Sequence, residues 1–63
     1  MRRLPEINDV VKISASGQLG VVRHIQKESR ECKLVKFDQL GNPISLGYLH
    51  ISVFTKIGYL GVA

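Results

Sequence analysis

The sequence predicts an all-β fold, and three observations support that prediction. β-branched and aromatic residues recur at every second position of short segments, as in strands that bury one face. Glycine, asparagine and proline separate these segments at short intervals. No segment has apolar residues at the i, i+3, i+4, i+7 spacing over three turns, so no amphipathic helix is expected. The alternative helix, Ile7–Lys12, contains the pair Val10-Val11, which disfavours it.

These glycine, asparagine and proline residues divide the chain into five short predicted strands and one predicted turn of 3₁₀ helix. The 3₁₀ turn is expected before the last strand, where the segment is too short and too β-branched for an α-helix. In chain order, the strands are expected at Val10–Ser14, Val21–Lys27, Cys32–Phe37, Pro43–Tyr48 and Val53–Ile57, with the 3₁₀ turn at Leu49–Ser52.

The first two strands follow from alternation and from a glycine-containing turn. Val11 and Ile13 alternate with polar neighbours, and the turn at residues 16–20 contains two glycines that permit positive φ. In the second strand, Val22 and Ile25 are expected to face the interior. Their spacing of three breaks the alternation, which indicates a β-bulge near the Arg23-His24 pair.

The third strand follows a polar hairpin tip at Glu28–Glu31 and has apolar residues on both of its faces. Val35 and Phe37 share one face, and Leu34 and Lys36 share the other. We expect Phe37 to lie in the core together with Phe54 of the last strand. Residues 38–42 then turn the chain into the fourth strand, because glycine and asparagine precede a proline there.

Length and composition limit the chain to one small domain. It has 63 residues, 44% of them hydrophobic, and its single cysteine excludes an intrachain disulfide framework and a zinc ribbon. Neither a transmembrane segment nor a signal peptide is expected, and a cytoplasmic location fits the lone thiol. A core this small is marginal, so tight packing, help from oligomerisation, or a partner is expected to stabilise it. Residues 1–8 are expected to form an N-terminal arm, and residues 58–63 an apolar C-terminal tail.

Five strands with a 3₁₀ turn before the last are the layout of a small SH3-like barrel, and over Asp9–Phe37 the sequence resembles the KOW motif. That motif has a hydrophobic strand, a turn, an essential glycine, hydrophobic residues two and five positions later, and a further alternating strand. The matching residues here are Gly20, Val22, Ile25, Val35 and Phe37. The resemblance implies a domain of the kind found in ribosomal proteins and NusG-type elongation factors, which binds RNA or protein. The same barrel also serves as an accessory subunit in photosynthetic and redox complexes.

The net charge of +4 is concentrated in the first three strands. Residues 10–37 contain six of the nine Lys and Arg residues, whereas Lys56 is the one charged side chain in residues 39–63. On a curled hairpin such cations would share a solvent face and attract phosphates, with an affinity that falls as salt rises. The alternative is a solvated face partly neutralised by Glu28 and Glu31. The candidate nucleic-acid-binding residues are Lys12, Arg23, Lys27, Arg30, Lys33 and Lys36.

The apolar tail offers a second kind of surface. It either adds a strand to the edge of the sheet or pairs with another chain, which would give a homo-oligomer or a docking site. Tyr48 and Tyr59 are also the candidate stacking platforms for single-stranded nucleic acid, because both phenylalanines are expected in the core. The candidate partner-binding residues are Tyr48, Leu49, Tyr59 and Leu60.

No catalytic site, metal site or cofactor is expected. His24 and His50 have no Cys, His, Asp or Glu at metal-ligand spacing, and they are expected to be surface or half-buried hydrogen-bonding residues. Cys32 has no motif for nucleophilic catalysis and is expected to be a buried small hydrophobe. Glu6 and Asp9 are an acid pair whose expected role is to end the N-terminal arm. The glycine-containing turn lacks the helix and Lys-Ser/Thr of a phosphate loop.

The sequence therefore predicts a binding module without enzyme activity of its own. The favoured partner is nucleic acid, bound through phosphate contacts of the basic hairpin. The main alternative is a protein-interaction or accessory subunit that docks into a larger complex through the apolar tail. A third alternative is a small stabilising subunit of an enzyme whose catalytic centre lies on another chain.

Overall fold

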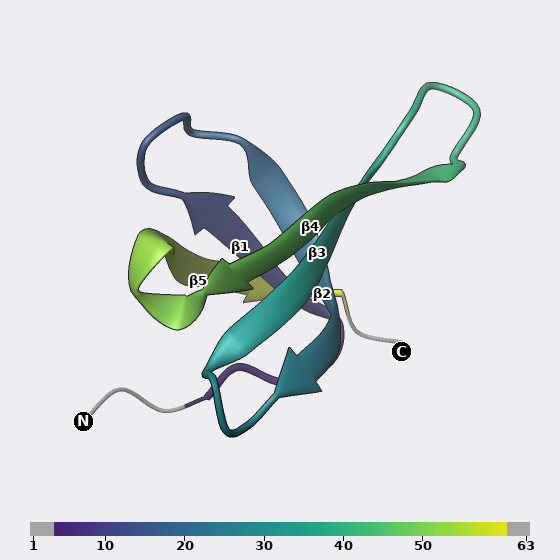
Figure 1. The fold of residues 1–63 in the computed structure, drawn as a ribbon. Coiled ribbons are helices and arrows are strands. Elements are labelled where there is room, and N and C mark those ends of the chain that lie inside the picture. The colour runs from purple at the N-terminus through teal and green to yellow at the C-terminus, as the bar shows by residue number, and fades with distance from the viewer. Residues whose placement is uncertain (1–3, 61–63) are drawn as a thin grey trace.

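The computed structural model describes residues 4–60, which form five strands and a three-residue 3₁₀ helix. The elements are β1 (Asp9–Ile13), β2 (Leu19–Gln26), β3 (Glu31–Phe37), β4 (Pro43–His50), η1 (Ile51–Val53) and β5 (Phe54–Tyr59) (Figure 1). The all-β prediction is confirmed. The 3₁₀ turn begins two residues later than predicted, because β4 continues to His50, whose ring Nδ1 accepts the backbone N–H of Ser52 and so caps η1.

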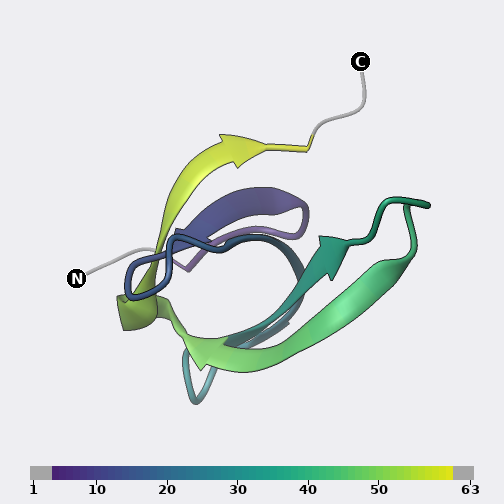
Figure 2. The same cartoon turned by 90° about the horizontal axis from the view of Figure 1, so that it is seen from above.

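All five strands belong to one antiparallel sheet with the order β4-β3-β2-β1-β5. The first four strands follow one another as neighbours, and β5 returns to pair with β1, with Ile13 opposite Phe54. The sheet is strongly curved, and seen from above it bends round on itself until η1 connects its two edges (Figure 2). Within residues 4–60 no pairing joins β4 to β5, so hydrogen bonds do not close the sheet.

The core fills the concave side of this sheet, which we call the inner face; the convex side is the outer face. Val22 and Phe54 are buried there and Ile25 packs against them, as predicted, and Cys32 is the predicted buried small hydrophobe. The core cluster consists of Val11, Val22, Cys32, Leu34, Ile51 and Phe54, with Leu4, Ile13, Ile25, Leu46 and Leu49 packed against it.

The prediction that Phe37 of β3 lies in the core is wrong. Leu34 is fully buried in the core, whereas Phe37 is 41% exposed. Because successive side chains of a strand point to opposite faces, Val35 and Phe37 lie on the outer face. Both faces of β3 carry apolar residues, so alternation alone does not distinguish the buried face from the exposed one. The outer face therefore carries an exposed aromatic ring that the sequence had assigned to the core.

Three register irregularities bend the sheet. The predicted bulge is confirmed, since the pairing of β2 with β3 shifts between Val22 and His24. Two others were not predicted: β1 shifts against β5 after Val10, and β3 shifts against β4 after Leu34. A bulge bends its strand and increases the local twist. Three of them in so small a sheet account for its tight curvature.

The predicted arm and tail are both attached to the sheet. Asn8 donates its backbone N–H to Val22 O at 2.9 Å, and its own carbonyl accepts the N–H of Leu60 at 2.7 Å. The tail thus adds to the edge of the sheet, with Tyr59 opposite Asp9 in the β1–β5 pairing. The first three residues of the arm and the last three of the tail lie outside the described residues.

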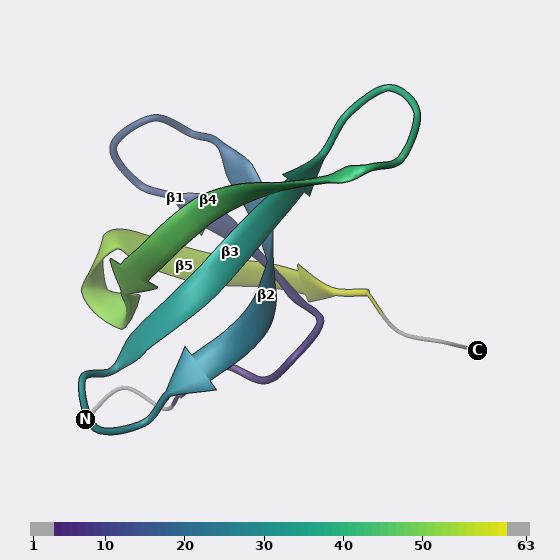
Figure 3. The same ribbon diagram turned by 45° about the vertical axis from the view of Figure 1, so that its right-hand side comes forward.

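The β3–β4 hairpin extends beyond the rest of the sheet (Figure 3). Its loop, residues 38–42, is ordered by Asp38, whose carboxylate accepts the backbone N–H groups of Asn42 at 2.8 Å and Leu40 at 2.9 Å. The hydrogen bond from Asn42 is the main reason that the pKa of Asp38 lies below its ordinary value. The loop holds the ends of β3 and β4 together, so that Phe37 faces Pro43 in register.

Gly20 lies where β2 passes over β3 on the inner face. A Cβ at this position would be 3.3 Å from Leu34 Cβ and 3.3 Å from Leu46 Cδ1, with Val35 O at 3.5 Å. This close approach favours glycine at position 20, because Leu34 and Leu46 would each have to shift by a few tenths of an ångström to admit a Cβ. In the preceding turn Gly17, with φ of 74°, is the residue that needs positive φ.

We predict that Gly20→Ala lowers the free energy of unfolding by about 1–3 kcal/mol, as expected for an extra methyl group in a packed core. Urea unfolding followed by circular dichroism measures this. Gly58→Ala is the matched control, because its nearest neighbour, Val10 Cβ, is 3.9 Å from the added Cβ and its φ is not positive. The control should change stability by less than about 0.5 kcal/mol. Equal effects of the two substitutions would contradict this account of Gly20.

Candidate nucleic-acid interface

A row of polar and aromatic side chains crosses the outer face of the middle three strands. The register places His24 of β2 opposite Lys33 of β3, and Lys33 opposite Tyr48 of β4. Tyr48 Oη lies 3.0 Å from His24 Nδ1, at hydrogen-bond distance, and the two rings meet edge to face with centroids 5.9 Å apart. This contact connects β2 and β4 across β3, at the register position of Lys33.

The bulge in β2 places Arg23 over the exposed ring of Phe37. Arg23 is the extra residue between the paired Val22 and His24. Its Cζ lies 5.7 Å from the centroid of Phe37, and its Nη1 donates to Asn8 Oδ1 at 3.3 Å. A guanidinium that stacks on a ring keeps N–H groups at its edge for carboxylates or phosphates. The bulge therefore does two things, since it bends the strand and orients a cation.

An apolar floor lies between the His24–Tyr48 pair and the Arg23–Phe37 pair. Val35 of β3 is buried on the outer face and faces Val21 of β2 in register. A shallow hollow over it is lined by Arg23, Lys33, Val35, Pro43 and Ser45. We call the set Arg23, His24, Lys33, Phe37 and Tyr48 the outer-face site. It combines two cations with two aromatic rings that are 41% and 42% exposed, those of Phe37 and Tyr48 respectively.

Of the six predicted nucleic-acid-binding cations, Arg23 and Lys33 are brought together. Lys27 and Arg30 lie in the turn at the tip of the same hairpin, where Arg30 has φ of 57° and its carbonyl accepts the N–H of Ile51. Lys12 is exposed on β1, opposite Leu19. Lys36 alternates with Val35 and Phe37 along β3, so its side chain belongs to the opposite face. The predicted cluster of all the hairpin cations on one face is therefore only partly formed.

Acidic groups reduce the positive potential near the tip of the hairpin. Glu31 is opposite Gln26 and His50 in register, which places it on the outer face two residues from Lys33. Glu28 is exposed in the turn. The more favourable region for an anion is therefore the end of the site around Arg23 and Phe37, away from the hairpin tip.

The four predicted partner-binding residues are divided among three places. Tyr48 belongs to the outer-face site. Leu49, next to it, points inward and packs against the core. Tyr59 and Leu60 are exposed on β5 and beyond it, at the far edge of the sheet. The sequence prediction missed Phe37 and the contact of His24 with Tyr48. The signal that was available for Phe37 was its position at the end of a strand, between the charged residues Lys36 and Asp38.

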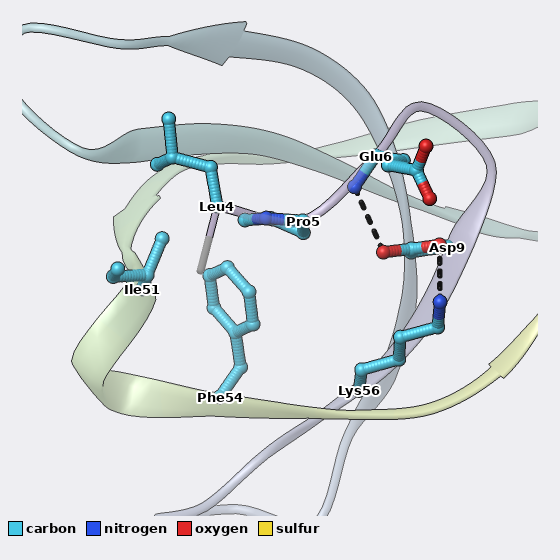
Figure 4. Close-up of a pocket in the computed structure, with 7 residues that line it drawn as sticks. All are labelled: Leu4, Pro5, Glu6, Asp9, Ile51, Phe54 and Lys56. Carbon is cyan, nitrogen blue, oxygen red and sulfur yellow. Dashed lines mark hydrogen bonds and ion pairs between the residues drawn. The ribbon is translucent and has the colours of Figure 1, made fainter. Parts of the chain in front are cut away.

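A second arrangement of charges lies on the other side of the sheet, around Asp9. This carboxylate is only 1% exposed; its Oδ2 accepts the N–H of Glu6 at 2.8 Å, and its Oδ1 is 3.2 Å from Lys56 Nζ (Figure 4). Asp9 also donates its N–H to Glu6 O at 3.0 Å. The two residues thus end the arm in a turn, as predicted, but the burial of Asp9 and its ion pair were not anticipated.

Cys32 is buried, and the two histidines make hydrogen-bond contacts within the fold. Burial raises the pKa of the Cys32 thiol, and the negative charge of Asp9 raises it further. His24 and His50 are both exposed and both make hydrogen-bond contacts, with Tyr48 and Ser52 respectively, as predicted. Within residues 4–60 no group of three or more His, Cys, Asp or Glu side chains is placed to hold a metal ion.

Comparison with protein-family models, with curated proteins and with solved structures finds no match to the chain. In the part of the chain that the structure describes, no helix is long and apolar enough to cross a membrane.

We predict that Cys32 resists alkylation in the folded protein. Iodoacetamide should modify it at least about 100-fold more slowly than in urea-unfolded protein, because a local opening that costs roughly 3 kcal/mol exposes under 1% of the molecules. Since the pKa of the thiol is raised above 9.0, the native rate should remain low even at pH 9.0. Mass spectrometry of timed samples measures both rates. Similar rates in the native and unfolded protein would contradict the buried position.

Proposed function

We propose that this chain is a non-catalytic nucleic-acid-binding module and that the outer-face site contacts single-stranded RNA or DNA. The observation that carries the proposal is the combination of two cations, Arg23 and Lys33, with two exposed aromatic rings on one convex face. Proteins that bind single strands combine such cations, which attract the phosphates, with aromatic rings on which bases stack.

The fold supports the same proposal. We infer that the curved sheet is an SH3-like barrel, because β5 returns to β1 after a 3₁₀ turn and the strand order is β4-β3-β2-β1-β5. The close approach of Gly20 to Leu34 supports the resemblance to the KOW motif, in which a glycine is essential at that place. The RNA- and protein-binding roles of that family are consistent with a binding module.

The site residues would have distinct roles. Arg23 and Lys33 contact phosphates on either side of the Val35 floor, while Phe37 and Tyr48 stack on bases. Lys27, Arg30 and Lys12 extend the positive potential and steer the approach of the strand. A convex face with protruding rings suits unpaired bases, since bases that are stacked and paired in a duplex do not expose their faces to side chains.

We predict binding that weakens steeply with salt and that prefers single strands. Fluorescence anisotropy with oligothymidylate or oligouridylate of about 12 nucleotides, from about 50 to about 300 mM salt, measures it. Arg23→Gln and Lys33→Gln should each reduce the slope of log K against log salt by about 0.7. Phe37→Ala and Tyr48→Ala should each weaken binding by about 1–3 kcal/mol.

Two matched controls test the position of the site. Lys36→Gln removes a lysine of the opposite face and should change the affinity less than Lys33→Gln. Tyr59→Ala removes a more exposed aromatic ring at the far edge and should leave binding unchanged. Absence of binding at about 50 mM salt would refute nucleic-acid binding. Binding of a duplex as tightly as of the single strand would refute the stacking role.

A second candidate function is docking into a protein complex through β5, and one observation favours it. Ile57 and Tyr59 of β5 and Leu60 just beyond it are all exposed, and the outer edge of β5 pairs with no strand among residues 4–60. An edge of this kind accepts a strand from another chain, and exposed apolar side chains then add affinity. The partner is either a second copy of the chain or a larger complex in which the chain is an accessory subunit.

We predict that Ile57→Lys and Leu60→Lys abolish such docking without unfolding the domain, because both side chains are exposed. Sedimentation velocity over a range of concentrations tests self-association, and cross-linking in cell extract tests a different partner. These point variants are cleaner than removal of residues 59–63, which would also delete the pairing of Tyr59 with Asp9. The β5 edge would be excluded as the docking site by two results together. The unsubstituted chain would be monomeric, and the two substitutions would leave its cross-links unchanged.

A further inference from the structure

The hollow beside Asp9 has the form of a small binding site. Leu4 and Pro5 of the arm form one wall, Ile51 and Phe54 form the opposite wall, and Asp9 and Lys56 lie at one end (Figure 4). Its volume is about 300 Å³, roughly ten times the 30 Å³ or so that a water molecule occupies in the liquid. The hollow is thus large enough for a short alkyl chain with a polar head.

Asp9 keeps acceptor capacity at the end of this hollow. Its Oδ2 is bound by the N–H of Glu6, whereas its Oδ1, although 3.2 Å from Lys56 Nζ, receives no well-aligned hydrogen bond from the described residues. A buried carboxylate is stable only if cations and donors compensate for its lost hydration. A ligand that supplies both a charge and a directed N–H donor would therefore be favoured at Oδ1.

The contact with Lys56 shows that the Asp9 carboxylate accommodates a primary ammonium group. Its Nζ is a primary ammonium on an alkyl stem, and it already sits at ion-pair distance from Oδ1. The Lys56 side chain is 51% exposed, and the same ammonium lies 5.8 Å from the centroid of Tyr59. It can therefore leave Asp9 and remain near the Tyr59 ring and solvent. Glu6 adds a second negative charge at the hollow, so the described lining residues carry one net negative charge in a chain of net charge +4.

We propose that this hollow binds a primary alkylammonium group. The alkyl chain packs between Leu4 and Phe54, and the ammonium donates to Asp9 Oδ1 in place of Lys56. Two sources share this chemistry, namely a small free amine and the lysine side chain of a protein partner. The site is separate from the outer-face site, and the proposal does not depend on nucleic-acid binding.

The test uses n-butylammonium and 1-butanol as probes, followed by NMR chemical shifts of the backbone amides of Asp9, Phe54 and Lys56. The two probes have the same shape, and n-butylammonium should bind about tenfold more tightly, the ratio expected for one charge-assisted hydrogen bond. Lys56→Met removes the resident ammonium and keeps its stem. That variant should bind n-butylammonium about fivefold or more tightly, because the competitor for Asp9 is gone.

A further variant and a peptide probe distinguish the possible results of this experiment. Asp9→Asn should lose the preference for the ammonium over the alcohol; if that variant does not fold, the comparison of Lys56→Met with the unsubstituted chain decides the matter. A blocked Gly-Lys-Gly peptide that binds more tightly than n-butylammonium indicates a lysine of a protein partner, and the reverse order indicates a free amine. Equal affinities for n-butylammonium and 1-butanol, or no gain in Lys56→Met, would overturn the proposal.

Discussion

The close approach of β2 to β3 at Gly20 is the contact on which the rest of the structure depends. A sheet of five short strands encloses a core only if it curls, and curling brings backbone and side chains of neighbouring strands within van der Waals distance. At Gly20 an added Cβ would lie 3.3 Å from both Leu34 Cβ and Leu46 Cδ1, so these neighbours would have to shift to admit it. The three bulges supply the bend, and the missing side chain lets the strands meet. Burial of Val11, Val22, Leu34 and Phe54 follows from that geometry.

The same bend produces the outer-face site. The extra residue that curves β2 is Arg23, and the curvature of the sheet sets its guanidinium over Phe37. Curling also makes the outer face convex, so apolar residues there, such as Phe37, are not covered by a second layer. The buried core and the outer-face site thus have one origin in this molecule. A straighter sheet would lose its core and would also separate the cation from the ring.

Much of the fold was predictable from the sequence because local signals are strong in a chain of short strands. Alternation and glycine punctuation located every strand, and the spacing of Val22 and Ile25 located one bulge. Phe37 was misassigned because β3 is apolar on both faces, and the buried face is decided by contacts with other strands. The buried Asp9 forms an ion pair with Lys56, which is distant in the chain and is brought near by the β1–β5 pairing, where it lies opposite Val11. No local pattern contains that information.

Asn8 connects β2, the end of β5 and the outer-face site. Its backbone N–H binds β2 at Val22, its carbonyl binds Leu60 beyond β5, and its side chain accepts from Arg23. Its φ of 74° is the left-handed conformation that asparagine tolerates better than most residues. A displacement of Asn8 at one of these contacts therefore changes the other two. Ligands of the β5 edge and of the outer face would share this residue, and thermodynamic linkage would make any effect of one on the affinity for the other reciprocal.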